Sequence, residues 1–398
     1  MTTGAITFAD ALPATAELVV IGGGVIGAAT ADAARRAGLR PLVLEARPML
    51  ASATTSVATG AYRLQQDDPD ELVLVRETVA AMRDFAGYTG QARYDPACVA
   101  NGRVVLTTTE EGAAAQRETA AHHASLGVDG IELLDGDEAR RRFPFLTPAV
   151  RQVRYRADDG VMDPKCLALG LLAGSRAPVV NRCRVLGFDI SGGVLAGVRT
   201  SRGTVATGSC VIAAGPLSGV VAATAGVDLP LRTLRRHRLV LPDVPQVPPD
   251  APLVYDEDTG AHWRPAFRGA YALLSERDNV AVDAVDDPPV DPGFPYKLLD
   301  PASPTSLART TAFWREVWED GRAAWASQCG LYTVTPDFRP LLDETPVAGL
   351  YVNTGYSGHG VMCSVGGGRH LLEIVTGART EKPFALDRVF VEPRSGLH

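Results

Sequence analysis

The sequence predicts an α/β protein of two domains, in which a parallel-sheet domain is interrupted by a mixed, β-rich domain. Three observations support this prediction. The chain has 398 residues, more than a single hydrophobic core usually accommodates. A strand, a helix and a second strand follow one another in residues 17–46. A segment rich in Pro and Asp, residues 229–328, then separates two stretches of α/β character and carries all four tryptophans.

The first of these features is a β-α-β unit with glycines at its turn. The strand "ELVVIGGG" runs into the Ala-rich helix "VIGAATADAARRAG", which stops at Gly38, and the strand "RPLVLEA" follows. Gly22, Gly24 and Gly27 have the spacing G-x-G-x-x-G. They permit, in turn, the tight turn, the approach of backbone to a pyrophosphate and the packing of helix on strand. Since the helix N-terminus also presents unpaired N–H groups to phosphates, the unit is predicted to be Rossmann-like and to bind a dinucleotide.

The second strand of this unit ends at Glu45, about 20 residues after the glycines, where a carboxylate can accept hydrogen bonds from ribose hydroxyls. The alternative is a glycine turn that holds no nucleotide, but the order of strand, helix, strand and Glu favours a nucleotide. A carboxylate here would repel a 2′-phosphate, so NADP is disfavoured. FAD and NAD remain open at this point.

The rest of the chain divides by composition. A hydroxyl-rich stretch, "ASATTSVATGAYRLQQ", precedes a helix that begins near residue 69, and a polar helix is expected near 110–126. From residue 163 onward a helix, a small β-meander and the buried strand of "CVIAAGPLSG" return to α/β character. We expect the nucleotide-binding domain to comprise residues 14–92, 151–228 and 329–398, and the second, substrate-binding domain to comprise residues 93–150 and 229–328.

Bulk properties exclude several classes of protein. The formal charge of −7 argues against a nucleic-acid partner and suits a small-molecule substrate. No apolar run is long enough for a membrane span and no secretory signal is visible, so we expect a cytoplasmic protein. The six cysteines are scattered without a C-x-x-C pair, which predicts reduced thiols and no metal site. None of these properties fixes the oligomeric state.

A second glycine-rich loop, "TGYSGHGVMCSVGGGR" at 354–369, runs into an apolar stretch of helical character. With it, the chain resembles the FAD-dependent amine and amino-acid oxidoreductases related to D-amino acid oxidase, glycine oxidase and monomeric sarcosine oxidase. The resemblance rests on "VVIGGGVIG" with Glu45, "DDGVMDP" at 158–164, "CVIAAGPLSG" at 210–219 and "GLYTVTPDFRPLLDETPVAGLYVNTGYSGHG" at 330–360. These segments follow the family's order across nearly the whole chain, and the last is the most specific.

This resemblance implies FAD rather than NAD, with the ADP half at the first loop and the isoalloxazine ring under the second. A helix starting near Val361 would point its N-terminus at the ring and stabilise negative charge at flavin N1 and C2=O on reduction. His359 would shape the flavin site rather than act as a base. By the resemblance, the residues that contact FAD are Gly22, Gly24, Val25, Ile26, Gly27, Glu45, Ala46, Arg47, Ala53, Thr54, Thr55, Ser56, Thr59, Val185, Ala214, Gly215, Gly330, Gly355, Gly358, His359, Gly360, Val361 and Met362.

The resemblance also implies a reaction. A C–H next to an amine delivers a hydride equivalent to flavin N5, and water hydrolyses the resulting imine, so the protein supplies orientation and electrostatics. An amino acid or a carboxylated secondary amine needs a cation for its carboxylate, and Arg63 of "GAYR" stands in the family's place for it. Arg264 of "HWRP" is a second candidate. Tyr332, where sarcosine oxidases carry tyrosine, favours secondary amines, and Tyr255 is expected in the pocket, together with His262, Trp263 and His237.

Two departures from the sarcosine oxidase pattern matter. Those enzymes bind flavin covalently through a cysteine at the place of Gly330, whereas here a cysteine, Cys329, lies one residue earlier. We therefore expect noncovalent FAD. They also carry a lysine, associated with oxygen reduction and the substrate carboxylate, at the place of Met362. An uncharged thioether makes an electron acceptor other than oxygen credible. Oxidation of a 2-hydroxy acid on the same fold and a NAD-dependent dehydrogenase are the alternative functions.

Overall fold

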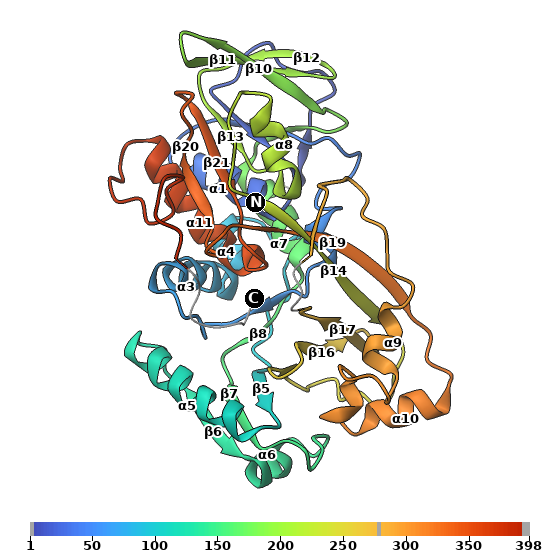
Figure 1. The fold of residues 1–398 in the computed structure, drawn as a ribbon. Coiled ribbons are helices and arrows are strands. Elements are labelled where there is room, and N and C mark those ends of the chain that lie inside the picture. The colour runs from blue at the N-terminus through green and yellow to red at the C-terminus, as the bar shows by residue number, and fades with distance from the viewer. Residues whose placement is uncertain (1–3, 277–279, 392–398) are drawn as a thin grey trace.

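The computed structural model describes residues 4–276 and 280–391 and has two halves, one above the other in Figure 1. A seven-stranded sheet in the order β1-β9-β3-β2-β13-β21-β20 forms the upper half, and all its neighbouring strands are parallel except β20 and β21. Its strands are β1 (Thr7–Phe8), β2 (Leu18–Ile21), β3 (Pro41–Leu44), β9 (Pro178–Val180), β13 (Cys210–Ile212), β20 (Leu341–Glu344) and β21 (Leu350–Thr354). The predicted α/β class is confirmed.

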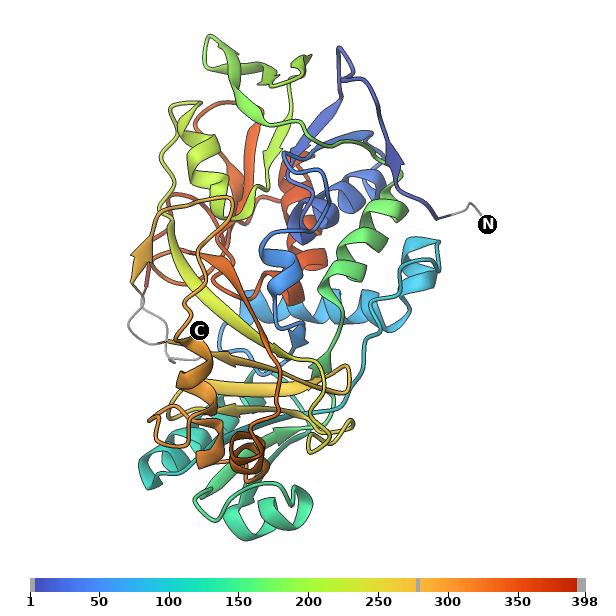
Figure 2. The same ribbon diagram turned by 90° about the vertical axis from the view of Figure 1, so that its right-hand side faces the viewer.

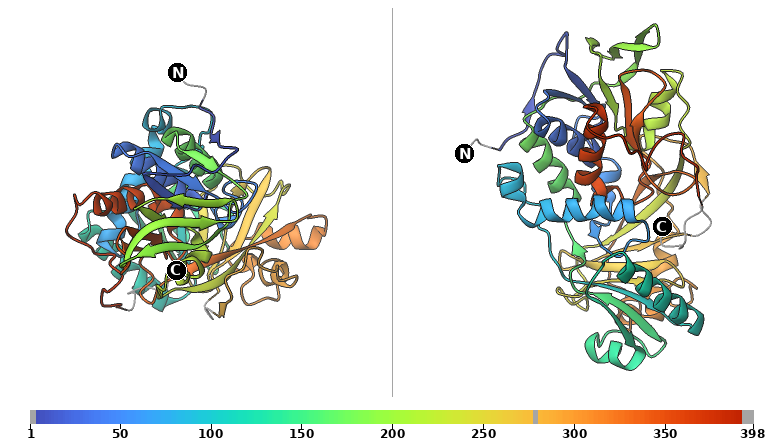
Figure 3. Two further views of the ribbon diagram at one scale, coloured as in Figure 1. Left: turned by 90° about the horizontal axis from the view of Figure 1, so that it is seen from above. Right: turned by 90° about the vertical axis from the view of Figure 1, so that its left-hand side faces the viewer.

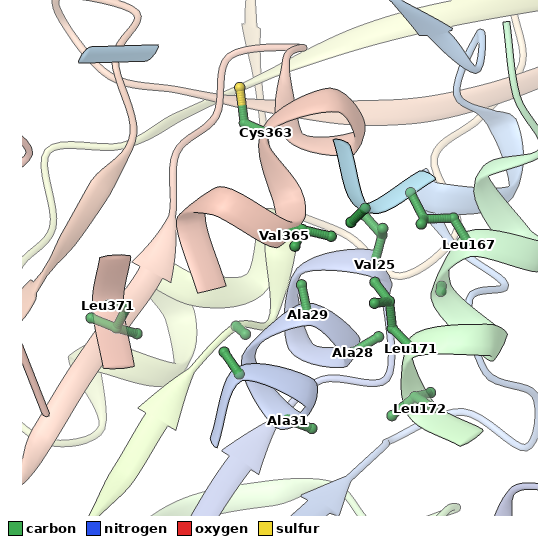
Figure 4. Packing of buried hydrophobic residues seen from close by; sticks show 14 of the residues in the cluster. Val25, Ala28, Ala29, Ala31, Leu167, Leu171, Leu172, Cys363, Val365 and Leu371 are labelled. Carbon is green, nitrogen blue, oxygen red and sulfur yellow. The ribbon is translucent and has the colours of Figure 1, made fainter. Parts of the chain in front are cut away.

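Helices cover one face of this sheet. They are α1 (Val25–Arg36), α3 (Pro69–Arg83), α4 (Phe85–Thr89), α7 (Pro164–Ser175) and α11 (Gly360–Val375). In Figure 4, Ala28 and Ala29 of α1 lie between Leu171 of α7 and Val365 of α11. A Cβ at Gly368 would lie 2.6 Å from the Ala29 carbonyl oxygen, so the glycines of "VGGGR" belong to α11 and let its backbone approach α1 closely.

The other face carries a three-stranded antiparallel meander, which lies at the top of Figure 1 and nearest the viewer in the left view of Figure 3. Its strands are β10 (Val185–Ser191), β11 (Val194–Thr200) and β12 (Gly203–Ala206), and α8 (Ser218–Ala223) packs beside them after the 3₁₀ turn η1 (Gly215–Leu217). Val20 of β2 belongs to the core on the helical side, whereas Val19 and Ile21 belong to the core under the meander. The central strand is therefore apolar throughout because both of its faces are covered.

The lower half is a nine-stranded sheet in the order β18-β14-β17-β16-β15-β5-β7-β6, with β19 paired to β14. Its strands are β5 (Arg103–Thr107), β6 (Ile131–Asp135), β7 (Gln152–Arg156), β14 (Arg232–Leu241), β15 (Leu253–Asp256), β16 (Ala261–Ala266), β17 (Gly269–Leu274), β18 (Ala281–Val282) and β19 (Ala326–Val334). The helices here are α5 (Glu110–Ser125), α6 (Gly136–Arg142), α9 (Phe294–Leu299), η2 (Leu307–Arg309) and α10 (Phe313–Asp320). Their core is aromatic: Trp263 packs against Phe145, Phe313 and Trp314.

Short elements and two long strands join the halves. The connections include α2 (Thr54–Val57) and the two-stranded ribbon of β4 (Ala61–Tyr62) with β8 (Gly160–Val161). In Figure 2, β14 and β19 run together between the halves, paired from Arg232↔Val334 to Val240↔Ala326. The lower sheet thus includes β7 and residues 329–334 of β19, which the expected boundaries at 150/151 and 328/329 had assigned to the nucleotide domain. We propose boundaries after β7 and after β19 instead; residues 392–398 of the last expected segment lie outside the described residues.

The turn after β19 is held by one buried ion pair. The Asp337 carboxylate accepts hydrogen bonds from Arg388 Nε at 2.7 Å and Nη2 at 2.8 Å, and from the Arg339 N–H at 3.1 Å. Burial raises the pKa of this carboxyl, but the hydrogen bonds and charge of Arg388 outweigh burial and hold the pKa below its usual range. This contact ties the C-terminal segment to the turn before β20.

Replacing Asp337 by Asn should lower the free energy of unfolding by about 3 kcal/mol at neutral pH, because the Arg388 charge would remain buried without its partner. A depressed pKa means that this stabilisation is present above the unfolded-state pKa and is lost as the pH falls through the folded-state pKa. Urea unfolding at several pH values should therefore show the difference narrowing in acid. Asp243→Asn, which breaks the exposed pair with Arg268, should cost under about 1 kcal/mol; equal losses would contradict the argument.

Candidate active site

One cavity of about 510 Å³ lies between the carboxyl edge of the seven-stranded sheet and the nine-stranded sheet. Strand ends of the upper half reach it at Ile21, Leu44, Ala213 and Thr354. The lower sheet contributes residues of β5, β15, β16 and β19 to its lining, together with Ser275, which follows β17. Ligands of open α/β sheets bind at this edge.

The first glycine loop is built as its spacing predicts. Gly22 has a φ of +116°, and a Cβ there would lie 2.4 Å from the Ala213 carbonyl oxygen. A Cβ at Gly27 would lie 1.9 Å from the Gly22 carbonyl oxygen, so α1 and the loop touch through backbone alone. Gly24 is the N-cap of α1 and supplies no side-chain cap, while Thr55 Oγ1 accepts from the Val25 N–H at 3.1 Å. The N-terminus of α1 therefore opens onto the cavity with space for an anion.

Glu45 is fixed by backbone contacts beside this loop. Its Oε2 accepts from the Gly23 N–H at 2.7 Å, and its Oε1 accepts from the Arg47 N–H at 2.7 Å. Each carboxylate oxygen can accept a further hydrogen bond. The carboxylate is therefore oriented at the cavity wall, as binding of ribose hydroxyls requires.

The second glycine loop forms the opposite end of the cavity. His359 is the N-cap of α11 and gives no side-chain cap to the helix, so this N-terminus also opens onto the cavity. Gly358 has a φ of +96°, and a Cβ there would lie 2.6 Å from the Tyr332 ring. The His359 ring lies between Arg63 and Glu71: its Nε2 is 3.3 Å from Arg63 Nη2, and its Nδ1 is 3.5 Å from Glu71 Oε1. Contacts on both ring nitrogens suit a positioning role.

The structure brings most of the predicted FAD residues to this cavity. Those in its lining are Gly22, Gly24, Val25, Ile26, Glu45, Ala46, Arg47, Ala53, Thr54, Thr55, Thr59, Val185, Ala214, Gly215, Gly330, Gly355, Gly358, His359, Gly360, Val361 and Met362. Two residues lie behind the wall. Gly27 packs under the first loop, and Ser56 donates its hydroxyl to the Ala53 carbonyl oxygen at 2.8 Å.

The predicted substrate residues divide in the same way. Arg63, Tyr332, Tyr255 and Met362 line the cavity, but Arg264 does not. Arg264 Nε donates to the Thr59 carbonyl oxygen at 2.6 Å and its guanidinium lies 4.6 Å from the ring centre of Tyr271, so it supports the cavity wall from behind.

Of the three further residues expected in the pocket, one lines the cavity and two do not. His262 lines the cavity, whereas Trp263 lies in the aromatic core of the lower half. His237 stacks on Phe294 with ring centres 4.8 Å apart, away from the cavity. One cavity residue that sequence reasoning missed is Arg103, the first residue of β5. The signal for it was weak: a single charge opening the apolar stretch "RVVLTTT".

The guanidinium group of Arg63 is oriented by hydrogen bonds to neutral groups. Arg63 Nη1 donates to the Gln65 carbonyl oxygen and to Gln66 Oε1, the latter at 3.1 Å. Gln66 Nε2 in turn lies 3.9 Å from Met362 Sδ, in the first turn of α11. Burial raises the pKa of Tyr332, which keeps its phenol neutral. This end of the cavity can thus hold an anion next to the α11 N-terminus.

The residues of the cavity fit FAD. Two helix N-termini without capping side chains, those of α1 and α11, face one space from opposite ends. Gly215 has a φ of +54°, and a Cβ there would meet no atom of the described residues within 4 Å, so the wall is open beside it. The N–H groups of the α1 N-terminus would bind the diphosphate of FAD, and the Glu45 carboxylate would accept hydrogen bonds from its ribose. The α11 N-terminus would stabilise the negative charge that the flavin ring gains on reduction.

Fold and cavity together are those of a dinucleotide-binding protein in which a second sheet closes the cavity at the carboxyl edge of the first. The family model described as "FAD dependent oxidoreductase" matches residues 17–374, and the chain belongs to this family. It is therefore a FAD-dependent oxidoreductase, with FAD as its cofactor, and the NAD-dependent alternative is wrong. No helix within residues 4–276 and 280–391 is long and apolar enough to cross a membrane.

Relatives of known name are distant. Mitochondrial sarcosine dehydrogenase of Homo sapiens is 26% identical over 383 residues, which are 93% of this chain and 41% of that protein. The chain thus spans about two fifths of this relative. D-amino acid dehydrogenase of Sinorhizobium medicae is 26% identical over 323 residues, 77% of this chain and 70% of that one. The solved structure of glycine oxidase from Geobacillus kaustophilus has a TM-score of 0.81 at 23% identity, covering 95% of this chain and 100% of that chain.

Acid precipitation should release all FAD from the protein, and the denatured chain should have the mass of its sequence alone. A cysteine side chain at position 330 would not fit, since a Cβ there would lie 2.5 Å from Val57 Cγ2. Cys329 lines the cavity, but burial raises the pKa of its thiol to about 11, so the thiol is protonated at neutral pH and a poor nucleophile. Absorbance of the supernatant and mass spectrometry of the pellet check this; flavin retained by the chain would contradict it.

Proposed function

We propose that the protein oxidises the C–N bond of an amino acid or carboxylated secondary amine. The observation that carries this proposal is Arg63, a buried guanidinium that lines the cavity 3.3 Å from the His359 ring at the start of α11. A planar guanidinium fork is the group best suited to a carboxylate. A substrate held there by its carboxylate has its amine-bearing carbon beside the place of the flavin ring.

The reaction balances with groups available to such an enzyme. The amine carbon loses its hydrogen together with two electrons, which FAD accepts when bound. Water then adds to the C=N bond, and the products are a carbonyl compound and an amine. The chain orients the carboxylate through Arg63, excludes water with the half-buried Tyr332 and the buried Met362, and stabilises negative charge with the α11 N-terminus.

The names of two relatives support this substrate class, because sarcosine and D-amino acids are both amines that carry a carboxylate. The electron acceptor is proposed to be oxygen or another oxidant, since Met362 brings no positive charge to the flavin side. A cytoplasmic location is part of the same proposal and is supported by the six cysteines, all of which are free thiols.

An anaerobic reduction panel tests the proposal. The holoenzyme is mixed with glycine, sarcosine, iminodiacetate, D- and L-alanine, D- and L-proline, and the 2-hydroxy acids glycolate and D- and L-lactate, and the visible flavin absorbance is followed. Bleaching by at least one amine, with carbonyl product formed in equal amount, is the expected result. Bleaching by 2-hydroxy acids alone, or by none of the panel, would overturn it. Admitting oxygen afterwards and measuring peroxide identifies the acceptor.

A further inference from the structure

Arg103 is a buried cation of the cavity without a counter-ion. Its residue is 8% exposed, and its Nε is buried without a hydrogen-bond partner. Within residues 4–276 and 280–391, no hydrogen bond or ion pair to its guanidinium is found; the group lies 5.3 Å from the ring centre of Tyr255. Burial, and next the positive charge of Arg63, lower the pKa of Arg103 from its usual value. A buried charge in this state is costly unless an anion joins it.

The neighbouring groups do not neutralise it. The Asp159 carboxylate acts on Arg103 through its charge, but it already accepts from the Leu64 N–H at 3.0 Å, Gln65 Nε2 at 2.8 Å and Arg156 Nη1 at 2.8 Å. Asp159 does not line the cavity. Arg103 therefore presents its charge to the cavity and forms no ion pair with a carboxylate among the described residues.

The acidic residues of the described cavity lining all lie at the other end. Glu45 serves the first loop, Asp286 accepts from Arg184 Nη2 at 2.6 Å, and Asp287 pairs with Arg47 Nη2 at 3.0 Å. Beside Arg103 the wall offers only neutral polar groups. His262 is kept neutral because burial lowers its pKa to about 4, and the Tyr255 hydroxyl pairs with Ser275.

Arg63 and Arg103 belong to adjoining walls of this end. Ala61 and Arg63, two residues apart along an extended segment, both line the cavity. Ala61 packs against the small cluster of Val105, Leu253 and Tyr255 on the lower sheet, and Leu253 is the strand partner of Arg103. The guanidinium groups of Arg63 and Arg103 thus face the same end of the cavity, and the described lining of this end has no acidic residue.

We propose that Arg103 binds a second carboxylate of the substrate, so that the preferred substrate is a secondary amine or amino acid with two carboxylates. Arg63 holds the carboxylate next to the oxidised carbon, and Arg103 holds the distal one beside Tyr255, Ser275 and His262. This inference rests on the proposed function for the reaction, but the binding site itself does not require turnover. A monocarboxylic amine would leave the Arg103 charge buried and unpaired.

Binding of unreactive sulfur analogues separates the two ideas. Thiodiacetate carries two carboxylates, and methylthioacetate (CH3–S–CH2–CO2−) carries one. Neither compound has an amine to oxidise. Titration of the holoenzyme with each, followed by the change in the flavin spectrum, should give a Kd at least about 30-fold lower for thiodiacetate. Equal affinities would overturn the inference. If thiodiacetate binds preferentially but no amine, including iminodiacetate, reduces the flavin, the second-carboxylate site stands and the proposed function fails.

Substitutions at position 103 test whether Arg103 causes the preference for thiodiacetate. Arg103→Met should abolish the preference by weakening thiodiacetate binding alone, and Arg103→Lys should restore part of it. Arg268→Met, at an exposed arginine in the turn between β16 and β17, should leave the preference unchanged. Without ligand, Arg103→Met should melt at the same temperature or higher, because an unpaired buried charge is removed. A lower melting temperature would assign Arg103 to the fold. An equal loss for methylthioacetate would show that both arginines hold the same carboxylate.

Discussion

Replacing Arg63 by methionine should lower kcat/KM for a carboxylated amine by about 100-fold or more. The Arg63 side chain is buried, and hydrogen bonds to the Gln65 carbonyl oxygen and to Gln66 Oε1 orient its guanidinium group. Loss of a desolvated guanidinium from a carboxylate pair typically costs about 2–5 kcal/mol, much of it from the carboxylate left without a partner. Since the carboxylate is bound in both ground state and transition state, the loss should fall mainly on KM. Steady-state kinetics with the best amine of the panel measure it.

The matched control is chemical. The methyl ester of the same amine has no carboxylate, so its kcat/KM should be equally low in both enzymes. Arg63→Lys keeps the charge without the planar fork and should lie between wild type and Arg63→Met. FAD content and melting temperature must match in all three proteins. If the acid and its ester respond alike to Arg63→Met, the residue acts through the flavin site or the fold and not through the carboxylate.

The parts of the fold that were predicted correctly are those whose signals are local. The turn from β2 to α1 is encoded in neighbouring residues, and its glycines have the backbone conformations and close contacts expected of them. The start of α11 at Gly360 was expected one residue later, at Val361. The glycines of "VGGGR" lie inside this helix, where α1 and α3 approach it closely, a contact that the local sequence does not show.

The local sequence could not place the side chains whose direction depends on distant strands. All five residues of β5 are buried, so "RVVLT" shows no alternation that would identify the cavity-facing side. Arg103 faces the cavity because β5 pairs with β15 on one side and β7 on the other. Arg264 lies opposite Tyr271 in the β16–β17 ladder and extends behind the cavity instead. The choice between these two arginines is a property of the sheet register, which no local pattern contains.

The boundaries that we propose for the second domain differ from the expected ones for a related reason. β7 follows a segment of helix and turn, yet its partners β5 and β6 lie earlier in the chain, before α6. β19 leads directly into the turn at Asp337 but pairs with β14 over its whole length. Long-range pairing therefore decides which half of the molecule each strand joins.

Replacing Gly27 by alanine should abolish stable FAD binding. The added Cβ would lie 1.9 Å from the Gly22 carbonyl oxygen, which is backbone and cannot rotate away. Relief requires α1 to move away from β2, and this movement withdraws the helix N-terminus from the diphosphate and shifts the loop that carries Gly24. Overpacking of this kind costs about 1–3 kcal/mol in the protein alone. We expect the purified variant to be nearly colourless and its affinity for added FAD to fall at least about 100-fold by the loss of matched phosphate contacts.

Gly219→Ala is the matched control for this experiment. Gly219 lies in α8, has an ordinary backbone conformation, and a Cβ there would meet no atom within 4 Å among the residues that the structure describes. Alanine should therefore leave FAD binding unchanged and raise the free energy of unfolding by up to about 1 kcal/mol. Flavin-to-protein absorbance ratios and urea unfolding of the apoproteins separate the effect on the cofactor from the effect on the fold. If Gly27→Ala retained FAD with wild-type affinity, the first loop would not be the ADP site, and the assignment of the two cavity ends would have to be reversed.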